Sequence, residues 1–211
     1  MDVIVLAKEP VAGRVKTRLC PPCTPETAAD LATAALVDTL EAAGASGADR
    51  VVLALDGRPG PWCPPGVVVV DQGEGGLDRR LTRAWTATAG PAVQIGMDTP
   101  QLTAADLAGC MTCLLAPGVD AVLGPAADGG WWAVGFRRPE PGAFLGVPTS
   151  RPDTGRRQLR RLRDLGLAVG TLPERTDVDT WADALTVASS HPRTRFAAAV
   201  RAQLARLEAV R

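Results

Sequence analysis

The sequence predicts a single-domain α/β fold in which a mostly parallel β-sheet carries helices on both faces. Short runs of aliphatic and β-branched residues alternate along the chain with longer segments of helical character, the pattern produced by β-α-β connections. The chain has 211 residues, of which 46% are hydrophobic. That length suits one large domain, and that composition is ample for a sizeable core.

Seven short apolar runs are interpreted as strands. The first, residues 2–7 (DVIVLA), has five consecutive apolar residues after Asp2, as expected for a strand covered on both faces of a parallel sheet. The other six lie at residues 50–56, 67–71, 92–96, 120–124, 131–136 and 167–172. Ligands of such folds bind where the strands end at their carboxyl edge, so polar residues there are candidate site residues.

The segments between the strands carry recognisable helix starts. Thr24-Pro25-Glu26 indicates an N-cap followed by proline in the first turn of a helix that runs to about Ala43. Thr103, with Asp106 three residues later, indicates the start of a helix that ends near Leu115. Further helices are expected at residues 76–89, 156–165 and 195–210, with a short helix before the last of these.

The charge balance limits the class of partner. Lys+Arg and Asp+Glu are both 23, so the formal net charge is zero, and the basic excess of a nonspecific nucleic-acid binder is missing. No run approaches ~20 apolar residues, so no membrane span is expected. The N-terminus passes directly into a strand, without the basic and apolar regions of a signal peptide. We therefore expect a cytoplasmic protein that does not bind nucleic acid.

Four of the five cysteines form two CxxC spacings, Cys20/Cys23 and Cys110/Cys113. An odd number of cysteines argues against a secreted disulfide framework. A four-cysteine zinc site would require both pairs to converge. The second pair lies in an apolar helical segment, where cysteine behaves as a small hydrophobe. Structural or incidental roles are favoured, and zinc binding and redox chemistry stay open as alternatives.

Positive charge is concentrated directly after the first strand. The segment AKEPVAGRVKTRL places Lys8, Arg14, Lys16 and Arg18 within eleven residues, with Gly13 among them. Arginine offers paired donors to phosphate, lysine offers a compact charge, and glycine allows close backbone approach. Neither the Walker spacing nor GxGxxG is present. The segment predicts an anion site, with a solvated basic loop as the alternative.

Three carboxylates follow later strands. Asp98 lies in IGMDTPQL after the fourth strand, and Asp177 and Asp179 lie in TDVDT after the last. Turn formation and helix capping are the plainer explanations. Because the carboxyl ends of parallel strands share one edge, we expect all three to meet the basic loop. Such oxygen ligands suit Mg²⁺ or Mn²⁺ and leave room for substrate phosphates.

A third polar block follows the fifth strand. In Asp128-Gly129-Gly130, two glycines after an aspartate indicate close approach of the backbone to a ligand. Trp131 and Trp132 offer an aromatic face, and one of them is expected to point into the core because neighbours on a strand alternate. The junction at residues 73–81 (GEGGLDRRL) is explained equally well as an anion contact or as a plain turn and cap.

Four blocks in this order resemble the DUF2064 group of GT-A-like glycosyltransferases, which belongs with the nucleotide-diphospho-sugar transferases. The blocks are AKEPVAGRVKTRL, IGMDTPQL, GPAADGGWWAVGF and DVDTWADAL. The resemblance implies a Rossmann-like GT-A domain over residues 1–190, followed by a C-terminal helix at residues 191–211. It also implies a nucleotide-sugar donor and a divalent metal, Mg²⁺ or Mn²⁺.

The resemblance also implies roles for individual residues. Asp98, Asp177 and Asp179 would hold the metal, and Asp98, Asp128 and Lys16 would take part in catalysis, with Asp128 as the base for an acceptor hydroxyl. The residues that would face the nucleotide or its phosphates are Lys8, Gly13, Arg14, Lys16, Arg18, Gly76, Gly129 and Gly130. Gly76 and Trp131 depart from the residues usual in the group, which leaves the donor and the acceptor open.

Two alternatives remain. Lys8, residues 16–19 (KTRL) and residues 76–78 (GLD) also resemble the phospholactate/phosphoenolpyruvate guanylyltransferases of the same superfold. Those enzymes transfer a nucleotidyl group from a nucleoside triphosphate to a phosphorylated small acid. The second alternative is a nucleotide-sugar binding protein without catalysis. The expected partners are a nucleotide sugar or nucleoside triphosphate and a small-molecule acceptor. The apolar spacing of residues 196–210 leaves a homo-oligomer open.

Overall fold

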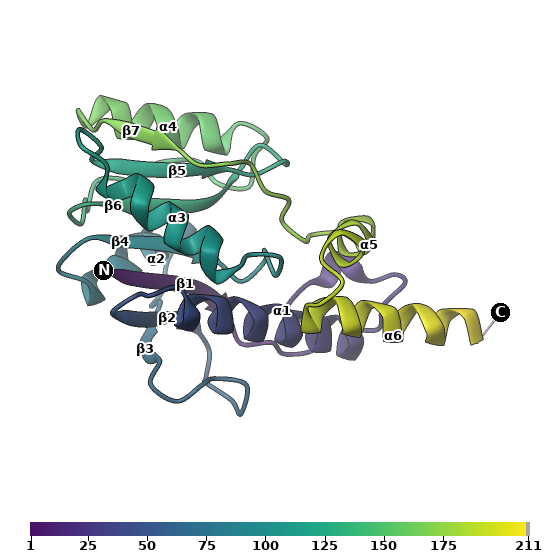
Figure 1. Cartoon of the computed structure of the whole chain (residues 1–211). Helices are drawn as coiled ribbons and strands as arrows, with labels where there is room; N and C mark the ends of the chain where they lie inside the picture. The colour runs from purple at the N-terminus through teal and green to yellow at the C-terminus, as the bar shows by residue number, and fades with distance from the viewer. Residues whose placement is uncertain (210–211) are drawn as a thin grey trace.

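A seven-stranded sheet forms the centre of the protein in the computed structural model, which describes residues 1–209 (Figure 1). Its strand order is β3-β2-β1-β4-β6-β5-β7. The strands are β1 (Asp2–Lys8), β2 (Arg50–Asp56), β3 (Val68–Asp71), β4 (Ala92–Gly96), β5 (Ala121–Pro125), β6 (Trp131–Phe136) and β7 (Val169–Thr171). All seven expected strands are confirmed.

Only β6 runs against its neighbours among the strands described. It pairs antiparallel with β4 and β5, whereas the other four strand pairs are parallel. The expectation of a mostly parallel sheet is therefore confirmed. β1 lies between β2 and β4, with Lys8 opposite Asp56 and Leu6 opposite Gly96. The carboxyl ends of β1 and β4 therefore lie side by side, and the chain segments that follow them share one edge of the sheet.

Within residues 1–209 the chain forms six α-helices and two short 3-10 helices, of which α5 and α6 follow the last strand and the others connect strands. They are α1 (Pro25–Ala45), α2 (Leu77–Ala84), α3 (Ala104–Leu115), α4 (Thr154–Asp164), α5 (Trp181–Ser190), α6 (Arg195–Ala209), η1 (Thr17–Leu19) and η2 (Trp85–Ala87). The Thr24 hydroxyl accepts a hydrogen bond from the Thr27 amide and caps α1. Thr103 and Asp106 form a reciprocal capping box at α3. Both predicted helix starts are confirmed.

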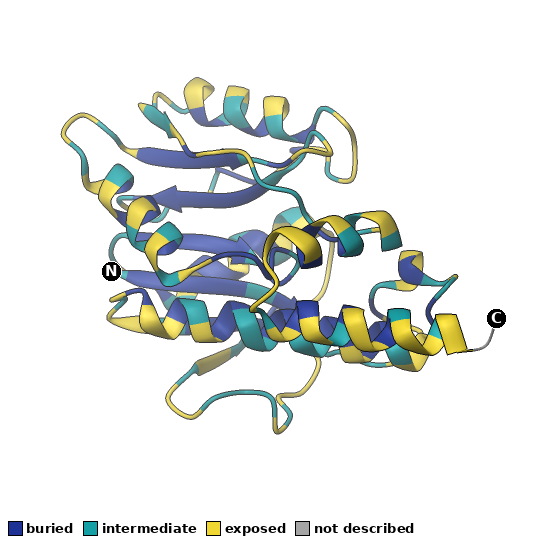
Figure 2. Cartoon of the chain, turned by 45° about the vertical axis from the view of Figure 1, so that its right-hand side comes forward, coloured by how far each residue is buried: buried dark blue, intermediate teal, exposed yellow. Residues whose placement is uncertain are grey.

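The central strands of the sheet are buried on both faces, as their apolar sequences predict, whereas the edge strand β3 is largely exposed. On one face, Val3 and Val5 pack with α1 and α3 side chains such as Leu36 and Leu107. On the other face, Ile4 packs in a cluster with side chains from α2 and α4. Figure 2 shows the central strands as a buried layer between helices whose outer faces are exposed.

The last two helices pack on α1. Leu31 and Ala35 of α1 share a buried cluster with Val187 of α5 and with Phe196 and Val200 of α6. Figure 1 shows α6 lying along α1. The carboxylate of Asp38 on α1 accepts hydrogen bonds from the first two backbone amides of α6, at 3.0 and 2.8 Å. The C-terminal helix is thus fixed to the preceding fold, and the division at residue 190 stays a prediction.

No helix within residues 1–209 is both long and apolar enough to cross a membrane.

Candidate active site

The basic loop is held at the edge of the sheet by its own backbone and by the buried side chains of Val15 and Leu19. The amide of Arg14 donates to the carbonyl of Val11 at 3.0 Å. Lys16 has a left-handed backbone (φ 48°) and directly precedes η1. Leu19, at the end of η1, is buried against α1. The loop therefore turns twice, and its basic side chains stay at the ends of β1 and β4.

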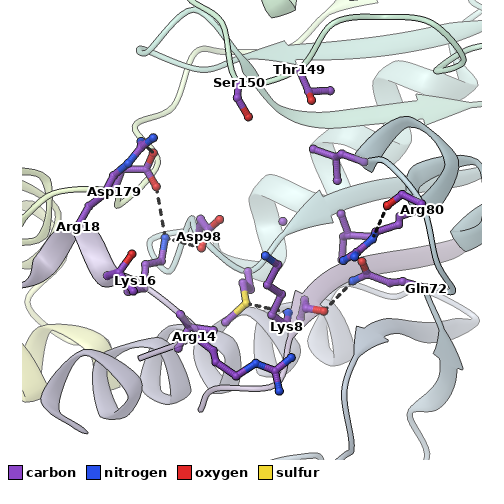
Figure 3. Close-up of a pocket in the computed structure, with 18 residues that line it drawn as sticks. Lys8, Arg14, Lys16, Arg18, Gln72, Arg80, Asp98, Thr149, Ser150 and Asp179 are labelled. Atoms are coloured by element: carbon purple, nitrogen blue, oxygen red, sulfur yellow. Dashed lines mark hydrogen bonds and ion pairs between the residues drawn. The ribbon is translucent and has the colours of Figure 1, made fainter. Parts of the chain in front are cut away.

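These side chains line a cavity of about 620 Å³ above the ends of β1 and β4 (Figure 3). We call it the basic compartment. Its charged lining residues are Lys8, Arg14, Lys16, Arg18, Arg80, Asp98 and Asp179. Basic side chains outnumber acidic ones by five to two there, so the compartment suits an anion with several charges.

A second cavity of about 430 Å³ adjoins the first. The two share Leu77, Asp98, Ser150 and Asp179 among their lining residues, so they are two parts of one cleft. We call the second part the acidic compartment. Its charged lining residues are Arg18, Arg151, Asp98, Asp128, Asp177 and Asp179. Four carboxylates face two guanidinium groups there, which is the opposite balance to that of the basic compartment.

Lys16 joins the two sides of the cleft. Its Nζ lies 2.5 Å from Oδ1 of Asp98 and 3.6 Å from Oδ1 of Asp179, and it donates a hydrogen bond to the carbonyl of Val178. The Lys16 side chain is only 9% exposed, whereas each carboxylate is 42% exposed. The Val178 amide donates to the backbone carbonyl of Asp98 at 2.8 Å. The basic loop, the end of β4 and the segment after β7 therefore meet at one ammonium group.

Asp177 is a partly buried carboxylate of the acidic compartment. Burial is the main cause that raises its pKa to about 6, and the negative charges of Asp98 and Asp128 raise it further. The hydroxyl of Thr99, which donates to Asp177 at 3.1 Å, and the more distant charge of Lys16 act in the opposite direction. A carboxylate in this environment is stabilised either by a proton or by an added cation.

The carboxylate oxygens of the cleft are the type of donor that a hard divalent cation prefers. No group of three or more His, Cys, Asp or Glu side chains within residues 1–209 has an arrangement suited to a metal ion. Mg²⁺, however, is commonly held by one or two carboxylates together with substrate phosphates and water. Asp98, Asp177 and Asp179 supply such oxygens beside the basic compartment. Joint ligation by all three remains a prediction.

The cysteines lie outside the cleft. All five are free, and none lines either compartment. Cys110 is buried in the core between the sheet and α3, and burial raises the pKa of its thiol to about 12. Burial likewise raises the pKa of Cys23 to about 11. Thiols that ionise so reluctantly are poor nucleophiles and poor metal ligands at neutral pH, which favours structural roles.

Three glycines expected to face a ligand, Gly13, Gly76 and Gly129, line neither compartment. Gly129 has a positive φ of 87°, and a Cβ there would lie 2.0 Å from the backbone oxygen of Pro152. Glycine is therefore required for packing against the loop before α4. Gly130 does line the acidic compartment, and its amide donates to Oδ1 of Asp128 at 2.8 Å.

Gly13 and Gly76 have other local roles. Gly13 adopts a positive φ of 75° in the turn of the basic loop, with nothing within 4 Å of the position of a Cβ. Gly76 is the residue that precedes α2. Its neighbour Gly75 lines the basic compartment instead. The Gly-rich junction thus reaches the cleft at Gly75 and Leu77, on either side of Gly76.

The two tryptophans point to opposite sides of β6, as expected from strand alternation. Trp132 is 3% exposed, and its Nε1 donates to the carbonyl of Pro173 at 2.9 Å. Trp131 is half-buried and lines the acidic compartment. Its ring stacks on Phe144, with 6.1 Å between ring centroids. Trp131 therefore supplies an aromatic wall that packing holds in place.

Several further residues line the cleft that no sequence pattern indicates. Thr149 and Ser150 line both compartments, opposite the basic loop (Figure 3), and Arg151 lines the acidic one. They precede α4 in a loop that has no recognisable motif. Arg80 lies in the GEGGLDRRL junction already noted, and its guanidinium pairs with Asp56 at 2.7 Å.

The fold is that of the nucleotide-diphospho-sugar transferases. A protein from Desulfovibrio desulfuricans G20, whose assignment as a nucleotide-diphospho-sugar transferase is provisional, has 26% sequence identity and a TM-score of 0.85. The match covers 97% of this chain and 95% of that one. The sequence profile of DUF2064, described as an uncharacterized protein conserved in bacteria, matches residues 27–151. That is more than half of the chain, and the chain belongs to this family.

More distant structures share the fold alone. Rv0371c from Mycobacterium tuberculosis H37Rv, solved in complex with manganese, is 22% identical with a TM-score of 0.53, over 88% of this chain and 97% of that one. The 2-C-methyl-D-erythritol 4-phosphate cytidylyltransferase from Thermus thermophilus is 17% identical with a TM-score of 0.54, over 89% and 97%. No curated protein matches the chain by sequence.

Proposed function

We propose that this protein is a metal-dependent glycosyltransferase that uses a nucleotide-activated sugar as donor. The observation that carries the proposal is the separation of charge within one cleft, with five basic side chains in one compartment and four carboxylates in the other. A nucleotide sugar has the matching polarity. Its diphosphate is strongly anionic, whereas its sugar and an alcohol acceptor are neutral and rich in hydroxyl groups.

In this proposal the diphosphate lies in the basic compartment. Lys8, Arg14 and Arg80 line that compartment and supply charge and hydrogen-bond donors to phosphate oxygens. Arg18 lines both compartments and is 73% exposed, with Asp179 as its partner at 3.2 Å. It therefore lies where the leaving diphosphate would separate from the sugar.

The sugar and the acceptor lie in the acidic compartment. Trp131 offers an aromatic face, and Thr149 and Ser150 offer hydroxyl groups. Asp128 is the proposed base. In the reaction, the acceptor oxygen forms a bond to the anomeric carbon, the bond from that carbon to the diphosphate breaks, and Asp128 takes the acceptor proton.

The proposed metal ligands are Asp98 and Asp179, which line both compartments, and Asp177, which lines the acidic one. A bound Mg²⁺ or Mn²⁺ would supply Lewis-acid stabilisation of negative charge on the leaving diphosphate. The side chains of the chain itself supply the remaining positive charge. Preorganised charge of this kind costs no reorganisation at the moment of reaction.

Nucleotidyl transfer is the second candidate, because five basic side chains in one compartment also suit a triphosphate. We rank nucleotidyl transfer second because of the charges that would surround its acceptor. A phosphorylated acid in the other compartment would face four carboxylates, and like charges so close together repel strongly. A binding protein without turnover is the third candidate.

A thermal-shift panel tests the proposal. UDP-, GDP-, CDP- and dTDP-sugars are compared with GTP, each with and without Mn²⁺. We expect one sugar nucleotide with Mn²⁺ to raise the melting temperature, since a ligand stabilises according to its concentration relative to Kd. Product analysis then separates the candidates. Release of a nucleoside diphosphate supports glycosyl transfer, pyrophosphate supports nucleotidyl transfer, and binding without product supports the third candidate.

Alanine variants test the metal site. Asp98→Ala and Asp177→Ala should each abolish metal-dependent turnover. Asp164→Ala, which removes an exposed carboxylate at the end of α4, serves as the matched control and should retain it. Full metal-dependent activity in both site variants would show that the metal is held elsewhere.

A further inference from the structure

Lys16 does not extend freely into the basic compartment, although its position in the loop suggests a phosphate ligand. Its ammonium group is held by three oxygens, one each from Asp98, Asp179 and the carbonyl of Val178. Its side chain is only 9% exposed, so little of it is available to a ligand in this arrangement. The structure therefore shows Lys16 engaged with the carboxylates rather than presented to an anion.

The ammonium group occupies the place that a metal ion would need. Its Nζ lies 2.5 Å from Oδ1 of Asp98, and a Mg²⁺ ion would require about 2.1 Å to the same oxygen. Two cations cannot approach one carboxylate oxygen on the same side at these distances, because their radii overlap and their charges repel. Lys16 or a divalent cation can thus occupy the place between Oδ1 of Asp98 and Oδ1 of Asp179, but not both in this geometry, while Arg18 remains paired with Oδ2 of Asp179.

The basic compartment can receive the displaced ammonium group. Lys16 lines the basic compartment as well as contacting the carboxylates. Lysine carries its charge on a flexible four-carbon stem, so the group can turn from Asp98 toward the centre of the compartment without movement of the loop. Figure 3 shows Lys16 beside Asp98 and Asp179 at the edge of that space.

We infer that Lys16 is the resident counter-ion of Asp98 and Asp179, that a divalent cation displaces it, and that the freed ammonium group then binds the phosphates of the donor. This inference rests on the metal site of the proposed function. It makes metal binding and phosphate binding cooperative through one side chain, and that coupling acts equally in both directions. Lys16 is thereby a binding residue for phosphate only when the metal is present.

The first test measures binding of Mn²⁺ alone to the full-length protein by electron paramagnetic resonance. Lys16→Met should bind Mn²⁺ at least about tenfold more tightly than the unaltered protein, a typical size for coupling between sites. Lys8→Met removes the same charge from the same compartment, but Lys8 has no ion pair with a carboxylate of the cleft. Its affinity for Mn²⁺ should stay within about threefold of the unaltered value, since long-range effects on exposed charges are screened.

The second test measures pyrophosphate, a probe that does not depend on the nucleotide base. Calorimetric titrations use pyrophosphate in EDTA and, separately, its manganese complex. Lys16→Met should leave the affinity for pyrophosphate in EDTA within about threefold, and should weaken binding of the manganese complex by about tenfold or more. A lysine that simply binds phosphate would weaken both titrations to the same extent.

Each outcome decides the inference. Equal changes in Mn²⁺ affinity for the Lys8 and Lys16 variants, or weaker Mn²⁺ binding by Lys16→Met, would overturn it. If no protein binds Mn²⁺ at the cleft, the inference and the metal site fail together, while a shift by sugar nucleotides would leave the proposed donor class standing. If Lys16→Met does not fold, Lys16→Gln replaces it, because its amide can still donate to Val178, and the same gain in Mn²⁺ affinity is expected.

Discussion

The hydroxyl of Thr99 donates a hydrogen bond to the carboxylate of Asp177 across 3.1 Å. This bond joins the turn after β4 to the segment after β7, two parts of the chain that meet only at the carboxyl edge of the sheet. It offsets only part of the cost of burying Asp177 beside Asp98, because the pKa of Asp177 is still raised to about 6. The site therefore contains an acid that is unfavourable in its ionised form.

This relationship predicts how stability depends on pH in the metal-free protein. Because the pKa of Asp177 is higher in the folded state than in the unfolded state, the folded protein binds more protons between about pH 4 and pH 6. The stabilising contribution of the protonated group is complete below pH 4 and is lost as the pH rises through 6. The ionised carboxylate then lowers the free energy of unfolding by up to about 3 kcal/mol at neutral pH.

The substitution Asp177→Asn tests this prediction, since an amide keeps the oxygen that accepts from Thr99 but cannot ionise. In EDTA at pH 7.5 the free energy of unfolding should rise by about 1–3 kcal/mol, and the gain should shrink toward zero as the pH falls to 4. Urea denaturation at several pH values measures both. Asp164→Asn, at an exposed position, should show no such trend, and a gain for Asp177→Asn that is constant with pH would contradict the assigned cause.

Most of the fold is predictable because its signals are local. The unbroken apolar run at residues 3–7 predicts a strand covered on both faces, and the Thr103/Asp106 pair predicts the start of a helix. The direction of β6 is not predictable in this way, since the alternation of side chains is the same in both directions. It follows from the short connection after β5, which returns the chain antiparallel within five residues, 126–130.

Less of the site is predictable, because its contacts depend on distant packing. Strand ends alone indicate that Lys8 and Asp98 lie near each other, and the structure places them in one cavity. The same reasoning cannot show that Lys16 turns back to pair with Asp98, because that pair depends on the left-handed backbone of Lys16 and the burial of Leu19. Nor does any local pattern bring Ser150 to the cleft from the loop before α4.

Two glycines with similar backbones should respond differently to alanine. Gly13 and Gly129 both have positive φ, but only at Gly129 would a Cβ collide with backbone, the oxygen of Pro152 at 2.0 Å. Gly13→Ala should cost about 1–2 kcal/mol of unfolding free energy, the usual penalty for a left-handed alanine. Gly129→Ala should cost more than about 4 kcal/mol, because the loop before α4 must move. Urea denaturation compares them, and equal losses would argue against the packing role of Gly129.

The position of α6 predicts that the C-terminal helix stabilises the whole fold. Phe196 is 1% exposed and packs in the cluster that includes Leu31 of α1. Phe196→Ala should lower the free energy of unfolding by about 3–5 kcal/mol through lost contacts and a cavity. Arg206→Ala, on an exposed position of the same helix, should change it by less than about 0.5 kcal/mol. Unfolding of α6 in a separate transition at a lower denaturant concentration, with the sheet still folded, would contradict this prediction.

Two neighbouring arginines test the basic compartment. Arg80 lines it and pairs with Asp56 at 2.7 Å, whereas Arg79 is exposed and lies outside the cavity lining. A charge-assisted hydrogen bond to phosphate contributes about 1.5–3 kcal/mol, so Arg80→Met should weaken pyrophosphate binding by about tenfold or more. Arg79→Met should leave that affinity nearly unchanged at 0.15 M salt, where exposed charges are screened beyond about 8 Å.

Loss of the partly exposed Arg80–Asp56 pair should cost at most about 1 kcal/mol of stability. A fall in affinity in a protein that still melts normally therefore isolates the contribution of Arg80 to anion binding. Equal affinities for the two variants would place the phosphates elsewhere in the cleft.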